Sequence, residues 1–252
     1  MSNIYNQTQV ATVNSDDLPQ SYLAYLAGGL FTQHDLGTNV ALKEAVWRLS
    51  KRRFVLLLPQ SKELRQLDVP DLPAYLRNVD LHLLVQADIL IARFDGTDID
   101  SGTIVEFMVA KMLGKPTVIL RSDSRHLSSD GLDDPYNLMM KNWPRTIEVH
   151  IDSHLNYLKM LDEEKKIIHD IGSEKLMLEA EHATIRRGIE TMAGRLIEAL
   201  NSVVTMESPY PPEYRELVYE AVRYAPGSGF DQLFTEQNLR ETLQKLTRRN
   251  TL

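Results

Sequence analysis

The chain has 252 residues, of which 43% are hydrophobic and 25% charged, and a formal net charge of −7; this is the composition of an ordinary soluble globular protein. It contains no cysteine, which excludes disulfides, thiolate metal sites and a cysteine nucleophile. The negative charge and the lack of a basic stripe argue against nucleic-acid binding. The polar N-terminus and the lack of a long apolar run argue against a signal peptide or a membrane span. We therefore expect a cytoplasmic enzyme or binding protein.

The N-terminal third begins with a polar segment, residues 1–20, which has no apolar periodicity and is predicted to be a flexible tail. Apolar runs at residues 22–27 and 54–58 predict two strands, and the spacing of apolar residues predicts a helix over residues 39–49 between them. Gly28 and Gly29 follow the first strand, where they allow a tight turn and close approach of the backbone to a ligand.

The middle of the chain contains a strand–helix–strand pattern. Residues 61–77 contain two prolines and predict a loop with short helical pieces, and residues 78–86 predict a helix. Residues 87–106 then combine a short apolar strand, an acidic glycine-containing loop and a helix start. Gly114 and Pro116 end that helix, and residues 117–120 form the next apolar strand, as in units that build parallel sheets.

The last part of the chain changes from mixed to helical patterning. A polar loop over residues 122–134, a short apolar element at 136–140 and an edge strand at 146–151 are predicted first. Helices are then predicted from about residue 153 to Gly172 and over residues 173–204, 213–224 and 231–248. The pattern predicts an α/β domain over residues 21–152, with a parallel sheet of about five strands flanked by helices, and an α-helical extension over residues 153–252.

Glu106 is unusual because it lies in a helix that is apolar on nearly every side, where only Glu106 and Lys111 are charged. One explanation is a capping box, in which Thr103 and Glu106 satisfy the free N–H groups at a helix start. The other is that Glu106 lies just beyond the carboxyl end of a strand, where open α/β sheets bind ligands. There the helix dipole would keep it ionised as a nucleophile. Local sequence is compatible with both.

Asp80 and Asp100 are further candidates, although Asp80 is also compatible with a surface helix and Asp100 with a loop cap. Asp95, Asp98 and Asp100 alternate through one loop, but their spacing is not that of a calcium loop, and we expect no metal. An ionised Glu beside protonatable Asp residues provides the groups that are needed for nucleophilic displacement at an acetal-like carbon.

Several separated segments together resemble the nucleoside 2-deoxyribosyltransferase family, whose members have a flavodoxin-like (Rossmann-like) core and transfer deoxyribose between nucleobases. These segments occur in the family's order over about residues 22–150, and they are Tyr25–Phe31, Ala87–Ala92 with Asp98–Glu106, Gly114–Pro116 and Asn137–Met139. The resemblance implies exchange of the nucleobase of 2′-deoxyribonucleosides through a covalent deoxyribosyl-glutamate intermediate. It also implies nucleoside and free nucleobase substrates and no cofactor.

The resemblance also implies a role for each site residue. Glu106 would be the nucleophile, Tyr25 would orient it, and Asp80 and Asp100 would contact the base and move its proton. Asn137 would reach the sugar's 5′-hydroxyl from a neighbouring subunit, which implies a homo-oligomer with shared sites. The substrate-binding set is Gly28, Gly29, Phe31, Gln60, Asp100, Gly102, Asn137 and Met139, and Gln60 matches its family counterpart only loosely.

The sequence departs from the family in two places and leaves two other functions open. The family usually has Gly two residues after the catalytic Glu, where this chain has Met108, and the helical region after residue 153 is longer than expected. The first alternative is a nucleoside 5′-monophosphate N-glycosidase, although residues 28–31 lack the serines that such hydrolases use for phosphate, and Ser122 and Ser124 lie in another loop. The second is a non-catalytic nucleotide-binding or sensor module.

Overall fold

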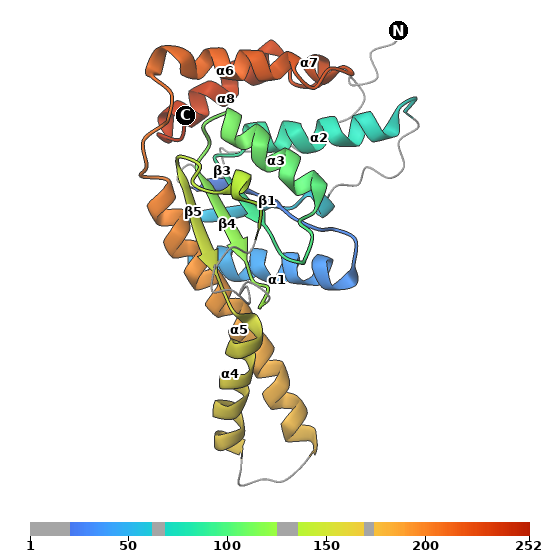
Figure 1. Ribbon diagram of the computed structural model, residues 1–252, viewed down its shortest axis with the longest axis vertical. Helices are drawn as coiled ribbons and strands as arrows, with labels where there is room; N and C mark the ends of the chain where they lie inside the picture. Colours follow the sequence, from blue (N-terminus) through green and yellow to red (C-terminus); the bar gives the residue numbers. More distant parts are fainter. Residues whose placement is uncertain (1–20, 62–68, 125–135, 169–173) are drawn as a thin grey trace.

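The computed structural model describes residues 21–61, 69–124, 136–168 and 174–252; the predicted tail and parts of three predicted loops or helix ends lie outside these ranges. Its five strands are β1 (Tyr22–Ala27), β2 (Phe54–Leu57), β3 (Ile89–Arg93), β4 (Thr117–Arg121) and β5 (Thr146–His150). All neighbouring strands are parallel, in the order β2-β1-β3-β4-β5. The predicted parallel sheet of five strands flanked by helices is confirmed (Figure 1).

The helices of the described residues are α1 (Gln33–Leu49), α2 (Leu72–Gln86), α3 (Ser101–Met112), α4 (Ser153–Ile168), α5 (Glu174–Val203), α6 (Pro212–Tyr224), α7 (Phe230–Leu233) and α8 (Glu236–Arg248). There are also two short 3-10 turns. η3 (Pro59–Ser61) follows β2, and η5 (Leu138–Met140) precedes β5. None of the helices in the described part of the chain combines the length and apolar character needed to span a bilayer.

Two apolar layers enclose the sheet. One layer packs α1 and α5 against the sheet, through side chains such as Leu42, Val46, Leu196 and Leu200. The opposite layer contains α2, α3 and the last three helices, with Leu84, Phe107, Tyr219, Phe230 and Leu246 among its buried side chains. Because β1, β3 and β4 are covered on both faces, their sequences are continuous apolar runs rather than alternating ones.

Three helices begin or end elsewhere than predicted, and each difference has a local cause. Helix α1 begins six residues before the predicted Asn39, because Thr32 and Asp35 form a capping box at its start. Helix α2 begins at Leu72 rather than residue 78, because Asp71 caps it and Pro73 is tolerated in a first turn. The predicted helix over residues 231–248 is two helices, since Thr235 forms a capping box that starts α8.

The C-terminal helices contribute to both layers of the core. Helix α5 supplies Met192, Leu196 and Val203 to the layer that contains α1, and α6, α7 and α8 cover the layer that contains α2 and α3. Helices α4 and the first part of α5 pair as a hairpin that projects beyond the sheet (Figure 1). The division at residues 152 and 153 therefore marks a change of pattern along the chain, and a separate domain there stays a prediction.

The buried carboxylate of Asp88 joins the end of the chain to the sheet. It accepts hydrogen bonds at 2.7 Å from the backbone N–H of Leu23 in β1 and at 2.5 Å from Nη1 of Arg249. Thr251 Oγ1 lies 3.4 Å from its other oxygen, and Asp88 is fully buried. A buried charge pair of this kind becomes costly when only one partner is removed.

We expect Asp88→Asn to lower the free energy of unfolding by about 3 kcal/mol, because the Arg249 guanidinium would keep its burial and lose its counter-charge. Urea unfolding followed by circular dichroism measures the change. Asp98→Asn, at an exposed position, is the matched control and should stay within about 0.5 kcal/mol of the parent. A loss below about 1 kcal/mol for Asp88→Asn would show that the carboxylate does not hold the C-terminal segment.

Candidate active site

Tyr25 and Glu106 form the centre of the candidate site. Tyr25 lies near the carboxyl end of β1, with its side chain fully buried in the layer of α2 and α3. Its Oη donates a hydrogen bond to Oε1 of Glu106, across 2.5 Å. Glu106 lies on α3 and is half-buried, so its carboxylate combines a fixed hydrogen-bond donor with access from outside.

The structure contradicts the capping-box explanation for Glu106. The N-cap of α3 is Asp100, whose Oδ2 accepts hydrogen bonds from both the backbone N–H and Oγ1 of Thr103 at 2.7 Å. The helix therefore starts at Ser101, and Glu106 is its sixth residue. Because the helix dipole acts mainly within the first turn, the expectation that the dipole holds Glu106 is also wrong. The neighbour that orients the carboxylate is the Tyr25 hydroxyl.

Burial and the negative charges of Glu106 and Asp80, in that order, raise the pKa of Tyr25 well above its usual value. The phenol therefore keeps its proton and acts as a donor to Glu106 at physiological pH. The effect of Asp80 on Tyr25 also shows that Asp80, on α2, lies near this pair. The structure thus brings together Tyr25, Asp80 and Glu106 from three elements that are far apart in the sequence.

Asp100 and Gly102 are linked by close packing at the start of α3. Asp100 is half-buried, and one of its carboxylate oxygens is occupied by Thr103. A Cβ placed on Gly102 would lie only 3.2 Å from Oδ2 of Asp100, which is closer than nearly all such contacts. A side chain at position 102 would therefore press on the carboxylate that caps the helix.

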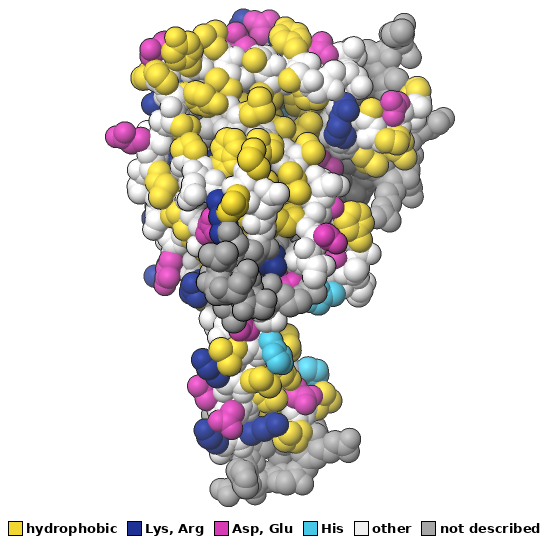
Figure 2. Space-filling view, viewed as in Figure 1, with side chains coloured by type: hydrophobic (Ala, Val, Ile, Leu, Met, Phe, Trp, Pro, Cys, Tyr) yellow, Lys and Arg dark blue, Asp and Glu magenta, His cyan; other side chains and the backbone are white. Residues whose placement is uncertain are grey.

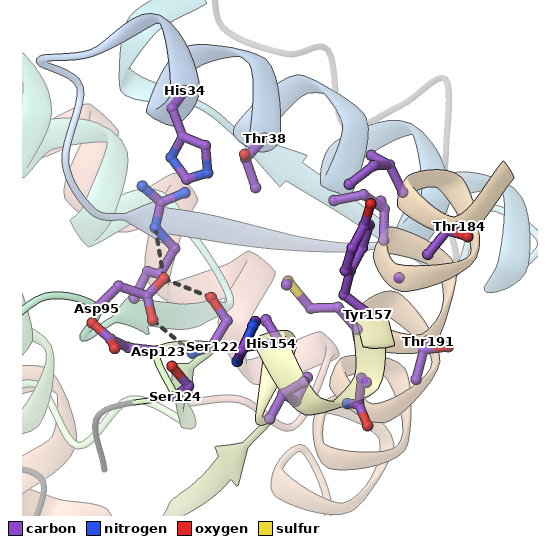
Figure 3. Close-up of a pocket in the computed structure, with 18 of the residues that line it drawn as sticks. His34, Thr38, Asp95, Ser122, Asp123, Ser124, His154, Tyr157, Thr184 and Thr191 are labelled. Carbon is purple, nitrogen blue, oxygen red and sulfur yellow. Dashed lines mark hydrogen bonds and ion pairs between the residues drawn. The ribbon is translucent and has the colours of Figure 1, made fainter. Parts of the chain in front are cut away.

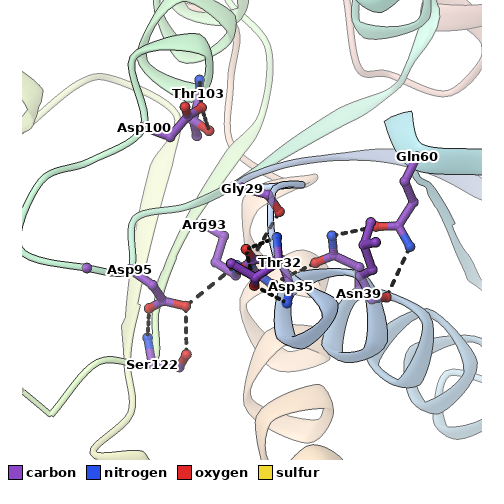
Figure 4. A network of polar contacts seen from close by, with 12 residues as sticks. Gly29, Thr32, Asp35, Asn39, Gln60, Arg93, Asp95, Asp100, Thr103 and Ser122 are labelled. Atoms are coloured by element: carbon purple, nitrogen blue, oxygen red, sulfur yellow. Dashed lines mark hydrogen bonds and ion pairs between the residues drawn. The ribbon is translucent and has the colours of Figure 1, made fainter.

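A polar network centred on Arg93 holds the glycine turn after β1 (Figure 4). Arg93, the last residue of β3, donates hydrogen bonds at 2.7 Å to Asp35 and to Asn39 of α1, and its Nη2 lies 3.4 Å from the carbonyl oxygen of Gly29. A Cβ on Gly28 would lie 3.2 Å from Cβ of Arg93. Gly28 thus permits the close approach that brings Arg93 under the turn.

Gln60 belongs to the same network. Its Oε1 accepts a hydrogen bond from Asn39 at 2.8 Å, and its Nε2 donates to the carbonyl of Leu36 at 3.0 Å. Both ends of the amide therefore contact α1. The sequence interpretation did not identify Arg93, Asp35 or Asn39. The signal in the sequence that could have identified Arg93 is its position as the single charged residue at the end of the otherwise apolar strand β3.

The remaining predicted binding residues lie on the surface. Phe31 is 82% exposed and Met139 is 77% exposed. Asn137 is exposed, and its Oδ1 accepts a hydrogen bond from the backbone N–H of Met139 at 2.9 Å, which caps η5.

The aspartates considered as a metal loop have different partners. Both oxygens of Asp95 accept hydrogen bonds from Ser122, Asp100 caps α3, and Asp98 is exposed. Among the residues that the structure describes, no three His, Asp or Glu side chains are grouped as metal ligands. The candidate site therefore contains a half-buried carboxylate, Glu106, that is held by a protonated phenol, with the Asp80 carboxylate nearby.

In comparisons with known proteins, residues 24–139 match the family model described as nucleoside 2-deoxyribosyltransferase. A conserved protein from Enterococcus faecalis V583 has 27% sequence identity over 54% of this chain and 94% of its own, with a TM-score of 0.46. A 2-deoxyribosyltransferase from Bacillus psychrosaccharolyticus has 20% identity over 52% of this chain and 85% of its own, with a TM-score of 0.40. Among curated proteins, none matches the chain.

The matched region contains most of β1, all of β2 to β4 and every residue of the candidate site, from Tyr25 to Met139. Helices α4 to α8 lie outside it. The resemblance seen in the sequence is confirmed: residues 24–139, a little under half of the chain, match the model of the nucleoside 2-deoxyribosyltransferase family.

Proposed function

We propose that the protein exchanges the nucleobase of 2′-deoxyribonucleosides, with Glu106 as the nucleophile. The observation that carries this proposal is the 2.5 Å hydrogen bond from the buried Tyr25 hydroxyl to Glu106 Oε1. A carboxylate that attacks carbon must be aimed and only partly desolvated. Glu106 is half-buried, and the Tyr25 hydroxyl holds its Oε1 in place.

In the first half-reaction, a carboxylate oxygen of Glu106 attacks the anomeric carbon of the nucleoside. The bond between this carbon and the base nitrogen breaks through an oxocarbenium-like transition state, and its electron pair stays on the base. A protonated carboxyl group, Asp80 or Asp100, gives its proton to the leaving base. The products are a free nucleobase and a deoxyribosyl ester of Glu106.

In the second half-reaction, a nitrogen of a different base attacks the same carbon from the face that the first base left. The ester bond breaks, Glu106 regains its negative charge, and the carboxylate that gave the first proton accepts one from the incoming base. Two inversions at one carbon leave its configuration unchanged. The two steps use only nucleoside and free base, so they need no cofactor.

Tyr25 has a second role in the proposed mechanism, which is to stabilise Glu106 while the negative charge of its carboxylate changes along the reaction. A buried phenol whose pKa is raised donates a hydrogen bond throughout, and it supports the carboxylate as leaving group in the second half-reaction. The glycine turn at Gly28 and Gly29, fixed by Arg93, would form the edge of the substrate pocket.

The proposed transfer is tested by incubating the protein with deoxyinosine and free adenine and separating the products by chromatography. Formation of deoxyadenosine is expected. Glu106→Gln should abolish it while the melting temperature stays within a few degrees, because Glu106 does not cap α3. Release of hypoxanthine alone would identify a hydrolase, and unchanged substrates would identify a binding module; either result would overturn the proposal. Deoxyinosine monophosphate run in parallel distinguishes a nucleotide from a nucleoside substrate.

Tyr25→Phe removes the hydroxyl and keeps the buried ring. We expect kcat to fall roughly 10- to 100-fold, since a hydrogen bond to a charged group contributes about 1.5–3 kcal/mol. Tyr22→Phe on the same strand is the matched control, because Tyr22 faces the opposite layer and stacks on Phe54. Equal kcat values for the two variants would remove Tyr25 from the mechanism.

We also propose that a second copy of the chain completes the site. Apolar side chains that face solvent include Val105 and Met112 of α3 and Leu138 and Met139 of η5. Figure 2 shows apolar side chains gathered over the part of the molecule that contains α3. Large exposed apolar patches mark interaction surfaces. Asn137, which the family resemblance assigns to a neighbouring subunit's site, adjoins Leu138 in this surface.

Leu138→Glu tests the shared site, because Leu138 is 69% exposed and a charge there should not unfold the subunit. We expect sedimentation analysis to show dissociation to monomers, with parallel loss of base exchange. Leu178→Glu, at another exposed position on α5, is the control and should change neither property. A Leu138→Glu protein that stays assembled, or that is active as a monomer, would contradict a shared site at this surface.

A further inference from the structure

A pocket of about 730 Å³ is drawn in Figure 3. Its lining residues Ile151, Ile189 and Met192 belong to the apolar layer on one face of the sheet, whereas Tyr25 belongs to the layer on the other face. The described residues that line it come from the start of α1, the segments after β3 and β4, and the hairpin of α4 and α5. Tyr25, Asp80, Asp100 and Glu106 are not among them. Its volume is within the range of small-molecule sites, and its position beyond the carboxyl ends of parallel strands is where α/β sheets bind ligands.

The hairpin end of the pocket contains an apolar surface. This surface includes Tyr157 and Met160 of α4 and Ile185, Ile189 and Met192 of α5, beside polar lining residues such as Asn156 and Thr184. Tyr157 is partly exposed, and its ring lines the cavity rather than the core. An aromatic ring flanked by thioether and aliphatic side chains offers a flat surface on which another ring packs well.

Gly188 is a second, independent sign that this space is kept open. It lies in the middle of α5 and lines the pocket, and a Cβ built there would meet nothing within 4 Å. Glycine inside a helix lowers stability relative to alanine, and no neighbouring atom in the described structure requires it here. A larger side chain at this position would extend into the cavity.

The described residues at the strand end of the pocket are polar, and their charges are mainly negative. Among them, Arg93 is paired with Asp35 at 2.7 Å and lies 3.6 Å from Asp95. Asp123 also lines this end, so the carboxylates of the described residues outnumber their guanidinium groups. Ser124 adds a hydroxyl group that can donate and accept hydrogen bonds, and the Ser122 hydroxyl, which donates to Asp95, can still accept one. An anionic ligand would meet net negative charge here, whereas a neutral molecule with a hydrogen-bonding edge would find partners.

We propose that this pocket binds a small uncharged molecule with a flat heteroaromatic ring, of the nucleobase or nucleoside class. The ring packs on Tyr157 beside Gly188, and the polar edge faces Ser122 and Ser124. The site is separate from Glu106, and the inference does not rest on the proposed transfer reaction. Because α1, α4 and α5 all line the pocket, a bound molecule would hold the base of the hairpin against the sheet layer.

The test uses adenosine as the probe and isothermal titration calorimetry on the wild type, Gly188→Leu and Gly194→Leu. Gly194 lies on the same helix, also has open space at its Cβ, and does not line the pocket, so it is the matched control. We expect Gly188→Leu to weaken one adenosine-binding event by at least about tenfold, and Gly194→Leu to leave it unchanged. Both variants should melt no lower than the wild type, because leucine favours the helix over glycine.

Two further measurements keep the test decisive. Tyr157→Leu removes the ring and retains apolar bulk, and it should weaken the same binding event if Gly188→Leu fails to fold. Adenosine 5′-monophosphate should bind the Gly188-dependent site more weakly than adenosine, because the phosphate would meet the carboxylates. Equal adenosine binding by Gly188→Leu and Gly194→Leu, or tighter Gly188-dependent binding of the monophosphate, would overturn the proposal.

Discussion

The hydrogen bond from Tyr25 to Glu106 depends on how the middle of the sheet is built. Strand β1 is paired on both sides, with β2 and β3, and Tyr25 is fully buried, so its hydroxyl has little freedom to move. Helix α3 is fixed at its start by Asp100 and along its length by buried Phe107 and Ala110. These constraints set the position of Glu106 relative to Tyr25. A carboxylate held by its surroundings before substrate arrives needs little reorganisation during reaction.

The C-terminal helices extend the apolar core on both faces of the sheet. Helix α5 covers one face of the sheet and α6 to α8 cover the other, and Asp88 joins Arg249 to β1. The same helices create features that the α/β core alone would lack, including the pocket between α1 and the hairpin of α4 and α5. Arg93 belongs to both regions, because it lines this pocket and also holds the glycine turn after β1. The pocket and the glycine turn thus share one buried guanidinium group.

The sequence predicted the sheet well because its strands are covered on both faces, which produces apolar runs that are readily recognised. It predicted β1 at its observed bounds and the edge position of β5. The predicted helix starts were less accurate, because more than one nearby residue matches the pattern of a helix cap. Thr103 and Glu106 match a capping box, yet Asp100 three residues earlier is the cap in the structure. The Arg93 network joins Arg93 to two residues that lie 54 and 58 positions away in the sequence. The pocket forms only where two helices converge. Local sequence patterns therefore could not identify either feature.

In the proposed mechanism, Glu106 carries the sugar between two half-reactions. The most direct measurement is mass spectrometry of protein mixed with deoxyinosine, without an acceptor base, and quenched in acid within the first turnover. We expect an intact mass raised by one deoxyribosyl group, located on the peptide that contains Glu106 and missing from Glu106→Gln. Base exchange without any such adduct, or with the adduct on another residue, would contradict it.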